Sequence, residues 1–255
     1  MYRAFYLNDA DWSEISGETG DAIYKRDRDV AKKSLESFLS NGILDGTKLS
    51  AHWFPKTKAD VFISHSHEDE DSAIRCASWF KDRLGLNSFI DSCVWGHADD
   101  LLKEIDDKHC LNPGGETYSY PKRNRSTSHV HMMLGAALSA MLDTTECVIF
   151  LKTLSSITSS DVVSRTKSPW LFFELATMHS LRRTVPERLS SRVIQENFSG
   201  TIKKAAELRV EYVVPLNHLT CLGADELNGL ARACESKSAK GHDALDILYA
   251  RHPER

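Results

Sequence analysis

A strand, a helix and a second strand follow one another between residues 59 and 91, and this succession constrains the fold more than any other feature of the chain. Residues 59–64, Ala-Asp-Val-Phe-Ile-Ser, form a short apolar run that is typical of a buried strand. Residues 72–84 carry apolar side chains at helical spacing, and Gly85 provides a helix stop. Residues 87–91 predict the second strand. A unit of about 30 residues in this order is typical of two parallel strands joined by a crossover helix.

The alternation of strands and helices continues through the second half of the chain. Residues 146–151, Glu-Cys-Val-Ile-Phe-Leu, predict a third strand. Residues 168–182 predict a helix with Ser168 as its N-cap and Pro169 in its first turn. The other expected elements are a helix over 129–142, a loop over 154–167, a fourth strand over 210–214, and short helices over 224–234 and 242–250. This alternation predicts an α/β fold with a mostly parallel sheet, in which ligands bind beyond the carboxyl ends of the strands.

Three segments lie outside this pattern. Residues 1–58 are expected to form a helical N-terminal extension, with a helix between residues 21 and 39. Residues 92–128 are polar and rich in turn-forming residues, and we expect them to form a long loop insertion after the second strand. Residues 217–255 are expected to form C-terminal helices that pack on a domain formed by residues 59–216.

The composition argues against several classes of protein. The 255 residues include 32 Lys and Arg against 36 Asp and Glu, which gives a formal net charge of −4. Binding to nucleic-acid phosphates needs an excess of Lys and Arg, so we expect no nucleic-acid partner. No run of about 18 apolar residues predicts a membrane span. The 6 cysteines include no CxxC pair, so we expect free thiols in a reducing cytoplasm.

Sequence motifs weigh against common enzyme classes and leave one metal-binding alternative. No GxGxxG or GxxxxGK[ST] follows a predicted strand, and no GxSxG elbow occurs. His65, His67 and Asp69, after the first strand, are residue types that bind zinc, so a metal-dependent hydrolase is one alternative. Asp91 and His218 would have to supply further ligands. The other interpretation is a polar turn whose acidic residues stabilise the start of the following helix.

Glu174 lies among apolar side chains in the helix predicted for residues 168–182. Burying a carboxylate is costly unless it has a partner or lines a cleft. Trp170 lies four residues earlier, which places both side chains on the same face of a helix. An aromatic ring and a carboxylate on one face can flank a flat, cationic ligand, so Trp170 is a candidate substrate-binding residue. The alternative interpretation is a glutamate on the exposed side of an amphipathic helix.

Several segments, in order along the chain, resemble the Toll/interleukin-1 receptor (TIR) domain family. Residues 59–64, followed by an acidic turn, resemble the first strand of the family, and residues 88–91, Ser-Phe-Ile-Asp, resemble its second strand. Residues 147–151 lie where the third strand belongs. Residues 168–175, Ser-Pro-Trp-Leu-Phe-Phe-Glu-Leu, match the S-x-W-x-x-x-E-L helix of the family. The resemblance covers residues 59–216 and is to bacterial TIR proteins that consume NAD in anti-phage defence.

The resemblance implies a flavodoxin-like α/β domain in which Glu174 is the catalytic residue and NAD is a substrate rather than a cofactor. In enzymatic members of the family, the Glu four residues after the Trp cleaves the nicotinamide–ribose bond. Nicotinamide departs from a ribosyl centre that becomes positively charged, and a carboxylate can stabilise this charge, as in glycoside hydrolysis. Attack by water gives ADP-ribose, and attack by another group of the same molecule gives a cyclic product. We therefore expect an NAD nucleosidase or ADP-ribosyl cyclase.

The resemblance also implies residues that bind the substrate. Asp91 and Trp95 resemble the D-x-x-x-W of some bacterial TIR proteins and are expected to line the cleft, with Trp95 stacking on the ligand. A packed loop aromatic is the other interpretation of Trp95. Ser64 and His65 are expected to hydrogen-bond the nicotinamide or the ribose. In this family, the loop that corresponds to residues 92–128 controls access to the cleft and contacts a neighbouring protomer.

A non-catalytic adaptor that signals by self-assembly is the main alternative. Many eukaryotic TIR domains act in this way, and an adaptor allows any residue at position 174. The acid at this position, with Asp91 and Trp95 nearby in the predicted fold, favours the enzyme. The resemblance further implies a homo-oligomer formed through TIR–TIR contacts and a partner protein that senses a trigger or reads the product. Enzymes of this family often need assembly to complete the site.

Overall fold

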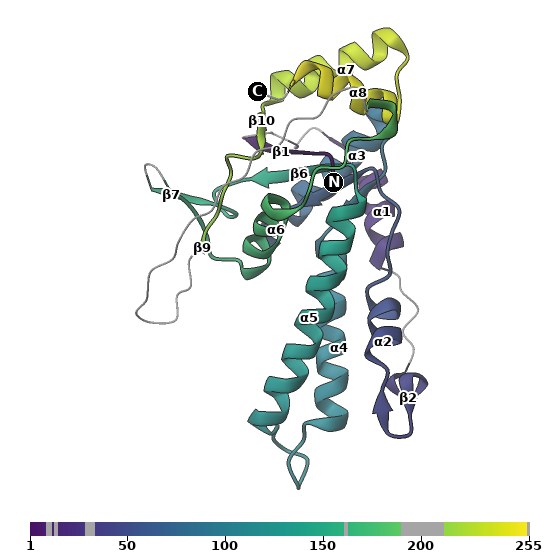
Figure 1. The fold of residues 1–255 in the computed structure, drawn as a ribbon, viewed down its shortest axis with the longest axis vertical. Helices are drawn as coiled ribbons and strands as arrows, with labels where there is room; N and C mark the ends of the chain where they lie inside the picture. Colours follow the sequence, from purple (N-terminus) through teal and green to yellow (C-terminus); the bar gives the residue numbers. More distant parts are fainter. Residues whose placement is uncertain (9–11, 13–14, 29–33, 161–162, 190–211, 254–255) are drawn as a thin grey trace.

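The computed structural model describes residues 1–8, 12, 15–28, 34–160, 163–189 and 212–253 (Figure 1). Within these residues, five parallel strands form the main sheet, in the order β10-β1-β6-β4-β5. The strands are β1 (Arg3–Asn8), β4 (Val61–Ser64), β5 (Ser88–Ile90), β6 (Cys147–Lys152) and β10 (Thr220–Leu222). Helices flank this sheet, so the predicted α/β fold with a parallel sheet is confirmed.

The strand order is that of a flavodoxin-like sheet, 2-1-3-4-5, with one difference in chain connectivity. Strands β5, β4 and β6 take the second, first and third positions. The fourth position, between β6 and β10, is taken by β1, which comes from the N-terminal end of the chain. Residues 3–8, which we expected in a helical extension, therefore form a strand in the interior of the sheet.

The residues of β1 suit a strand that is buried on both faces. Phe5 and Leu7 point to one face of the sheet and Ala4 points to the other, and all three are buried. β1 pairs with β6 along its whole length and with β10 on its other side. Its neighbours on both sides satisfy its backbone groups. β1 therefore joins β10 to the rest of the sheet.

The predicted fourth strand lies in a different sheet. Residues 212–214 of that segment are described, and of these Tyr212–Val213 form β9, which pairs with β8 (Val163–Thr166). β8 also pairs with β7 (Thr158–Ser160), so these strands form a small antiparallel sheet. The loop predicted over residues 154–167 therefore contains β7 and β8, where β-branched Thr and Val residues favour strands. Residues 210–211 lie outside the described residues.

Side chains alternate between the two faces of the main sheet and build two apolar cores. The helices are α1 (Glu18–Arg28), α2 (Gly46–Trp53), α3 (Glu70–Leu84), α4 (Ser92–His109), α5 (Tyr120–Thr144), α6 (Pro169–Ser180), α7 (Ala224–Lys237) and α8 (His242–Arg251). Shorter elements are η1 (Leu35–Phe38), β2 (Leu39–Ser40), β3 (Ile43–Leu44), η2 (His67–Asp69) and η3 (Glu187–Leu189). Phe5, Ile63 and Ile149 lie in one core, with residues of α1, α3, α7 and α8. Phe62 and Phe150 lie in the other core, with residues of α2, α4, α5 and α6.

Helices with strong local end signals occur where the sequence predicts them. α3 ends at Leu84, and the next residue, Gly85, closes the helix with a left-handed φ of 70° and an N–H bond to a carbonyl of the last turn. α6 begins after Ser168, which accepts a hydrogen bond from the N–H of Leu171 at 3.2 Å. The helix predicted between residues 21 and 39 is divided instead: α1 ends at Arg28, η1 follows later, and residues 29–33 lie outside the described residues.

The segment predicted as a loop over residues 92–128 is instead mostly helical. It contains α4 and the first part of α5, which lie side by side and form a long arm (Figure 1). Leu101 of α4 and Val130 of α5 are both fully buried in the second core. Ser126 of α5 donates a hydrogen bond to the carboxylate of Asp106 on α4. These contacts between the helices stabilise a segment whose own polar sequence indicated a loop.

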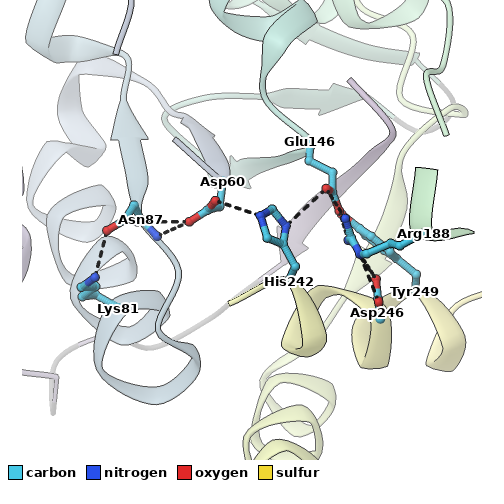
Figure 2. A network of polar contacts seen from close by, with 8 residues as sticks. All are labelled: Asp60, Lys81, Asn87, Glu146, Arg188, His242, Asp246 and Tyr249. Atoms are coloured by element: carbon cyan, nitrogen blue, oxygen red, sulfur yellow. Dashed lines mark hydrogen bonds and ion pairs between the residues drawn. The ribbon is translucent and has the colours of Figure 1, made fainter. Parts of the chain in front are cut away.

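A polar network joins the C-terminal helices to the edge of the sheet at which the strands begin (Figure 2). Arg188 donates hydrogen bonds to Glu146, just before β6, and to Asp246 of α8, at 2.9 and 2.8 Å. The ring of His242, on α8, lies 3.9 Å from a carboxylate oxygen of Asp60 and 3.5 Å from one of Glu146. This network lies at the amino ends of β4 and β6, on the opposite edge from the predicted site.

Candidate active site

Four polar side chains meet at the carboxyl edge of the sheet, where the strands end. Ser64 is the last residue of β4, and His65 follows it. Asp91 follows β5, and Glu174 lies in α6. Each of these residues is 0% exposed. We call these four predicted site residues the carboxyl cluster; they lie beside the position between β4 and β6 where ligands bind in flavodoxin-like sheets.

Direct contacts join the members of the carboxyl cluster into a chain. Ser64 Oγ donates a hydrogen bond to Glu174 Oε2 at 2.6 Å. His65 Nδ1 lies 2.6 Å from Asp91 Oδ1, and the backbone N–H of His65 donates to Asp91 Oδ2 at 3.4 Å. The carboxyl groups of Asp91 and Glu174 act on each other, and one buried oxygen of each, Asp91 Oδ1 and Glu174 Oε1, accepts no hydrogen bond from a described donor. Groups from two strand ends and one helix thus hold both acids in place.

α6 places Glu174 on its buried side. Leu171, Leu175 and Met178 are buried on the same helix, one residue after Glu174 or three or four residues away from it. The interpretation that Glu174 lies on an exposed stripe is therefore wrong. Ser168 sets where α6 begins, and the burial of these apolar side chains sets which side of the helix faces the sheet.

Burial and mutual interaction perturb both acids. Burial raises the pKa of Glu174 well above its usual range, and the charge of Asp91 raises it further, against the opposing hydrogen bond from Ser64. Burial also raises the pKa of Asp91, against hydrogen bonds from Glu174 and from backbone N–H groups. Two carboxyl groups that share a dry site do not both ionise near neutral pH.

His65 is neutral in this environment. Burial lowers its pKa to about 4, against the charges of Glu174, Glu70 and Asp69, which favour the protonated ring. A neutral imidazole carries a single proton, and Nδ1 is the nitrogen that faces Asp91 Oδ1. The ring also forms a hydrogen bond with the backbone carbonyl of Ile63.

Of the two predicted tryptophans, the structure describes the side chain of Trp170. Trp170 is half-buried, and its ring meets the ring of His131 on α5 edge to face, with centroids 5.3 Å apart. It lies four residues before Glu174 but packs toward the arm. Trp95 lies in the first turns of α4, and its side chain is outside the described residues.

The residues of the metal-binding alternative are used in other ways. Among the described residues, no group of three or more His, Cys, Asp or Glu side chains is arranged to hold a metal ion. Asp69 accepts hydrogen bonds from Ser66 Oγ and Thr153 Oγ1 and so links the turn after β4 to the loop after β6. The ring of His218 stacks on that of His179, with centroids 5.2 Å apart.

The part of the site that sequence reasoning missed is α1. Tyr24 Oη donates a hydrogen bond to Glu70 Oε2 at 2.9 Å, and Cys93 Sγ donates to the Tyr24 carbonyl at 3.7 Å. Because Cys93 lies two residues after Asp91, α1 covers the chain next to the carboxyl cluster. Apolar spacing predicted a helix in this segment, but local sequence carries no signal for the surface on which it packs.

The fold and the site together define an α/β protein with a flavodoxin-like sheet and a buried pair of acids at its carboxyl edge. No protein-family model, curated protein or solved structure matches the chain. Among the described helices, none is both long enough and apolar enough to cross a membrane. The functional argument therefore depends on the residues of the site and on the motifs that they form.

Proposed function

We propose that this protein is a TIR-like enzyme that cleaves the nicotinamide–ribose bond of NAD, as a glycohydrolase or cyclase, with Glu174 as the catalytic residue. The proposal rests on the position of Glu174, whose carboxyl group lies with Ser64 and Asp91 at the edge of the sheet where ligands bind. The S-x-W-x-x-x-E-L motif that resembles the TIR family supplies this same residue.

In the proposed reaction, the C1′–N bond of NAD breaks and its electron pair leaves with nicotinamide, which departs as a neutral molecule. The ionised carboxylate of Glu174 stabilises the positive charge that develops on the ribose. Water then forms a C1′–O bond and releases one proton, which gives ADP-ribose. Attack by a nucleophilic group of the same molecule gives a cyclic product. Ser64 orients the carboxylate through its 2.6 Å hydrogen bond.

Exposure of the carboxyl cluster is a requirement of this proposal. Its members are fully buried, so NAD reaches Glu174 after a covering segment moves. α1 is a candidate for that segment because it packs beside Asp91. We propose that assembly through TIR–TIR contacts produces this change. The substrate would then meet the residues we assign to its binding, which are Ser64, His65, Asp91, Trp95 and Trp170.

The cellular setting of the proposal follows from the same resemblance. We propose a role in bacterial anti-phage defence, with a partner protein that senses the trigger or reads the product. The 6 cysteines are free thiols, and 5 of them are buried. This favours a reducing cytoplasm as the location.

A non-catalytic TIR adaptor is the second candidate, and the full burial of Glu174 favours it. A hydrogen-bonded pair of buried acids can hold two loops and a helix in one arrangement without contacting a ligand. An adaptor would assemble and signal through its surface while NAD remains intact.

Chromatography of NAD after incubation with the protein distinguishes the two candidates. We would compare the wild-type protein with Glu174→Gln and with Glu116→Gln, a matched control at an exposed position between α4 and α5. Each protein is tested when dilute and when concentrated to drive assembly. We expect the wild type and Glu116→Gln to release nicotinamide, and Glu174→Gln to lose about 100-fold or more of that rate. Intact NAD with the assembled wild type would favour the adaptor.

A further inference from the structure

The proposed reaction uses the carboxylate of Glu174 and leaves open what Asp91 and His65 do at rest. We propose that Asp91 is a positioning residue that shares one proton with Glu174, so that the resting site holds its negative charge on Asp91 and the proton on Glu174. The part of this inference that concerns catalysis rests on the proposed function. The shared proton itself can be tested without NAD.

Proton sharing follows from the burial and the contact of the two acids. Asp91 and Glu174 are both 0% exposed, the consecutive residues Ser64 and His65 each bond one of them, and Asp91 Oδ1 and Glu174 Oε1 are buried without a hydrogen bond from a described donor. The two carboxyl groups act on each other. A hydrogen bond between two carboxyl groups needs a proton on one of them, since an ionised carboxylate only accepts. Two ionised carboxylates would instead repel each other where water cannot screen them. One proton therefore converts this repulsion into an attraction.

The surrounding donors decide which acid keeps the charge. Asp91 accepts the backbone N–H of His65 at 3.4 Å and further backbone N–H groups, from Ser92 and from Asp91 itself, and His65 Nδ1 lies 2.6 Å from its Oδ1. Glu174 accepts the hydroxyl proton of Ser64. Within the described residues, Asp91 thus has the larger set of donors that stabilise an anion. The remaining proton belongs on Glu174.

The wider surroundings also disfavour a second negative charge. The charged and titratable groups that act on His65 or Cys93, the neighbours of the pair, are Asp69, Glu70, Tyr24, Asp27 and Arg28. They come from the turn after β4, from α3 and from α1. Three of these five are acids and one is a base, so the groups around the pair carry more negative than positive charge.

If the two acids share a proton, Asp91 and Ser64 have opposite effects on the pH at which Glu174 loses its proton. Glu174 must release its proton to solvent before it can stabilise the ribosyl charge. Asp91→Asn removes the neighbouring negative charge, so Glu174 should lose its proton at lower pH. Ser64→Ala removes the donor that stabilises the carboxylate, so Glu174 should lose its proton at higher pH. If either residue had a purely structural role, the two substitutions would not shift the pKa of Glu174 in opposite directions.

Infrared spectroscopy of the protein without NAD tests the shared proton directly, because a buried protonated carboxyl group absorbs apart from ionised ones. The wild type should show this absorption at pH 7, and Glu174→Gln should lose it. When the pH is varied, the midpoint at which this absorption disappears should fall by about one pH unit or more in Asp91→Asn and rise in Ser64→Ala. Circular dichroism checks that each variant is folded. The pH profile of NAD cleavage should shift in the same directions.

The outcomes separate this inference from the proposed function. Opposite shifts of the two midpoints support the shared proton. Midpoints that stay in place, or that move in the same direction, overturn it, as does a wild-type protein with no protonated carboxyl absorption at pH 7. Opposite shifts combined with intact NAD in the assembled protein would support the shared proton and reject the proposed reaction.

Discussion

At the scale of single residues, the properties of the carboxyl cluster come from burial. A carboxyl group in water without charged or hydrogen-bonded neighbours ionises near pH 4. Asp91 and Glu174 have no contact with water in this arrangement, so the ionisation of each depends on the other and on the donors from Ser64 and His65. A substitution that removes one of these donors should therefore change the pKa values of the two acids strongly.

Glu174→Gln should stabilise the protein relative to wild type more strongly at pH 8 than at pH 4. The raised pKa of Glu174 means that its stabilising contribution is present below the ordinary pKa and is lost as the pH rises. Gln still accepts the hydrogen bond from Ser64 and has no proton to lose. Each tenfold change in proton affinity corresponds to about 1.4 kcal/mol. Urea unfolding of both proteins at the two pH values measures the difference between their free energies of unfolding. A difference that is the same at pH 4 and pH 8 would contradict the prediction.

His218→Gln should reduce the sensitivity of the protein to acid. Burial, with the charges of His179 and Arg183, lowers the pKa of His218 to about 4. Its neutral ring therefore favours folding above pH 6.5, and this contribution is lost as the pH falls toward 4, by up to about 3 kcal/mol. Unfolding of wild type, His218→Gln and the exposed control His129→Gln at pH 7 and pH 5 checks this. A variant with unchanged acid sensitivity would show that the ring titrates normally.

The residues of the site were easier to predict than the contacts between them. Ser64, His65, Asp91 and Glu174 follow predicted strands or lie in a motif, so their positions along the chain indicated one edge of the sheet. Their pairing could not be predicted, because it depends on how far α6 is rotated and on where β5 ends relative to β4. These are tertiary quantities that local patterns do not contain.

At the scale of elements, α1 and α3 cross closely at Gly20. The N–H of Gly20 donates to Ser78 Oγ at 2.7 Å, and a Cβ at this position would lie 1.9 Å from the carbonyl oxygen of Ile74. A backbone atom cannot move aside as a side chain can. Gly20 is therefore required for α1 to lie on α3 and cover the segment beside Asp91.

Gly20→Ala should destabilise the protein by about 1–3 kcal/mol, because the added methyl group forces the helices apart. Gly229→Ala in α7 is the matched control. Its Cβ would meet the end of the flexible Arg251 side chain, and Ala favours a helix over Gly by up to about 1 kcal/mol. Thermal unfolding of both variants measures the difference. Equal stability of the two would show that α1 does not pack as described.

Prediction of the elements succeeded where the signals were local. Gly85 and Ser168 mark helix ends through their own conformation or side chain, and both ends are as expected. The helical arm was missed because α4 and α5 stabilise each other through Leu101 and Val130, across a turn that indicated a loop. β1 was missed because a short apolar run at residues 4–7 is weak alone, and the TIR resemblance begins only at residue 59.

At the scale of the whole molecule, the N-terminal end of the chain completes the sheet. β1 lies between β6 and β10, so the C-terminal part of the chain reaches the sheet through it. The network of Arg188, Glu146 and Asp246 then holds α8 against the amino edge (Figure 2). The carboxyl edge with the carboxyl cluster is thus built on a sheet that needs both ends of the chain.

A fragment that begins at residue 59 should therefore fail to fold. Deletion of residues 1–58 leaves β6 and β10 without their shared neighbour and exposes the core face that Phe5 and Leu7 cover. Circular dichroism and thermal unfolding test this, with the full chain as the control. A cooperative unfolding transition in the fragment would show that residues 1–58 are a dispensable extension.

The central claim is that Glu174 acts on NAD, and nicotinamide release by the concentrated, assembled protein tests it most directly. The account predicts release by the wild type and a loss of about 100-fold or more in a folded Glu174→Gln protein. Equal rates for the two proteins, or no release by the assembled wild type, would contradict it.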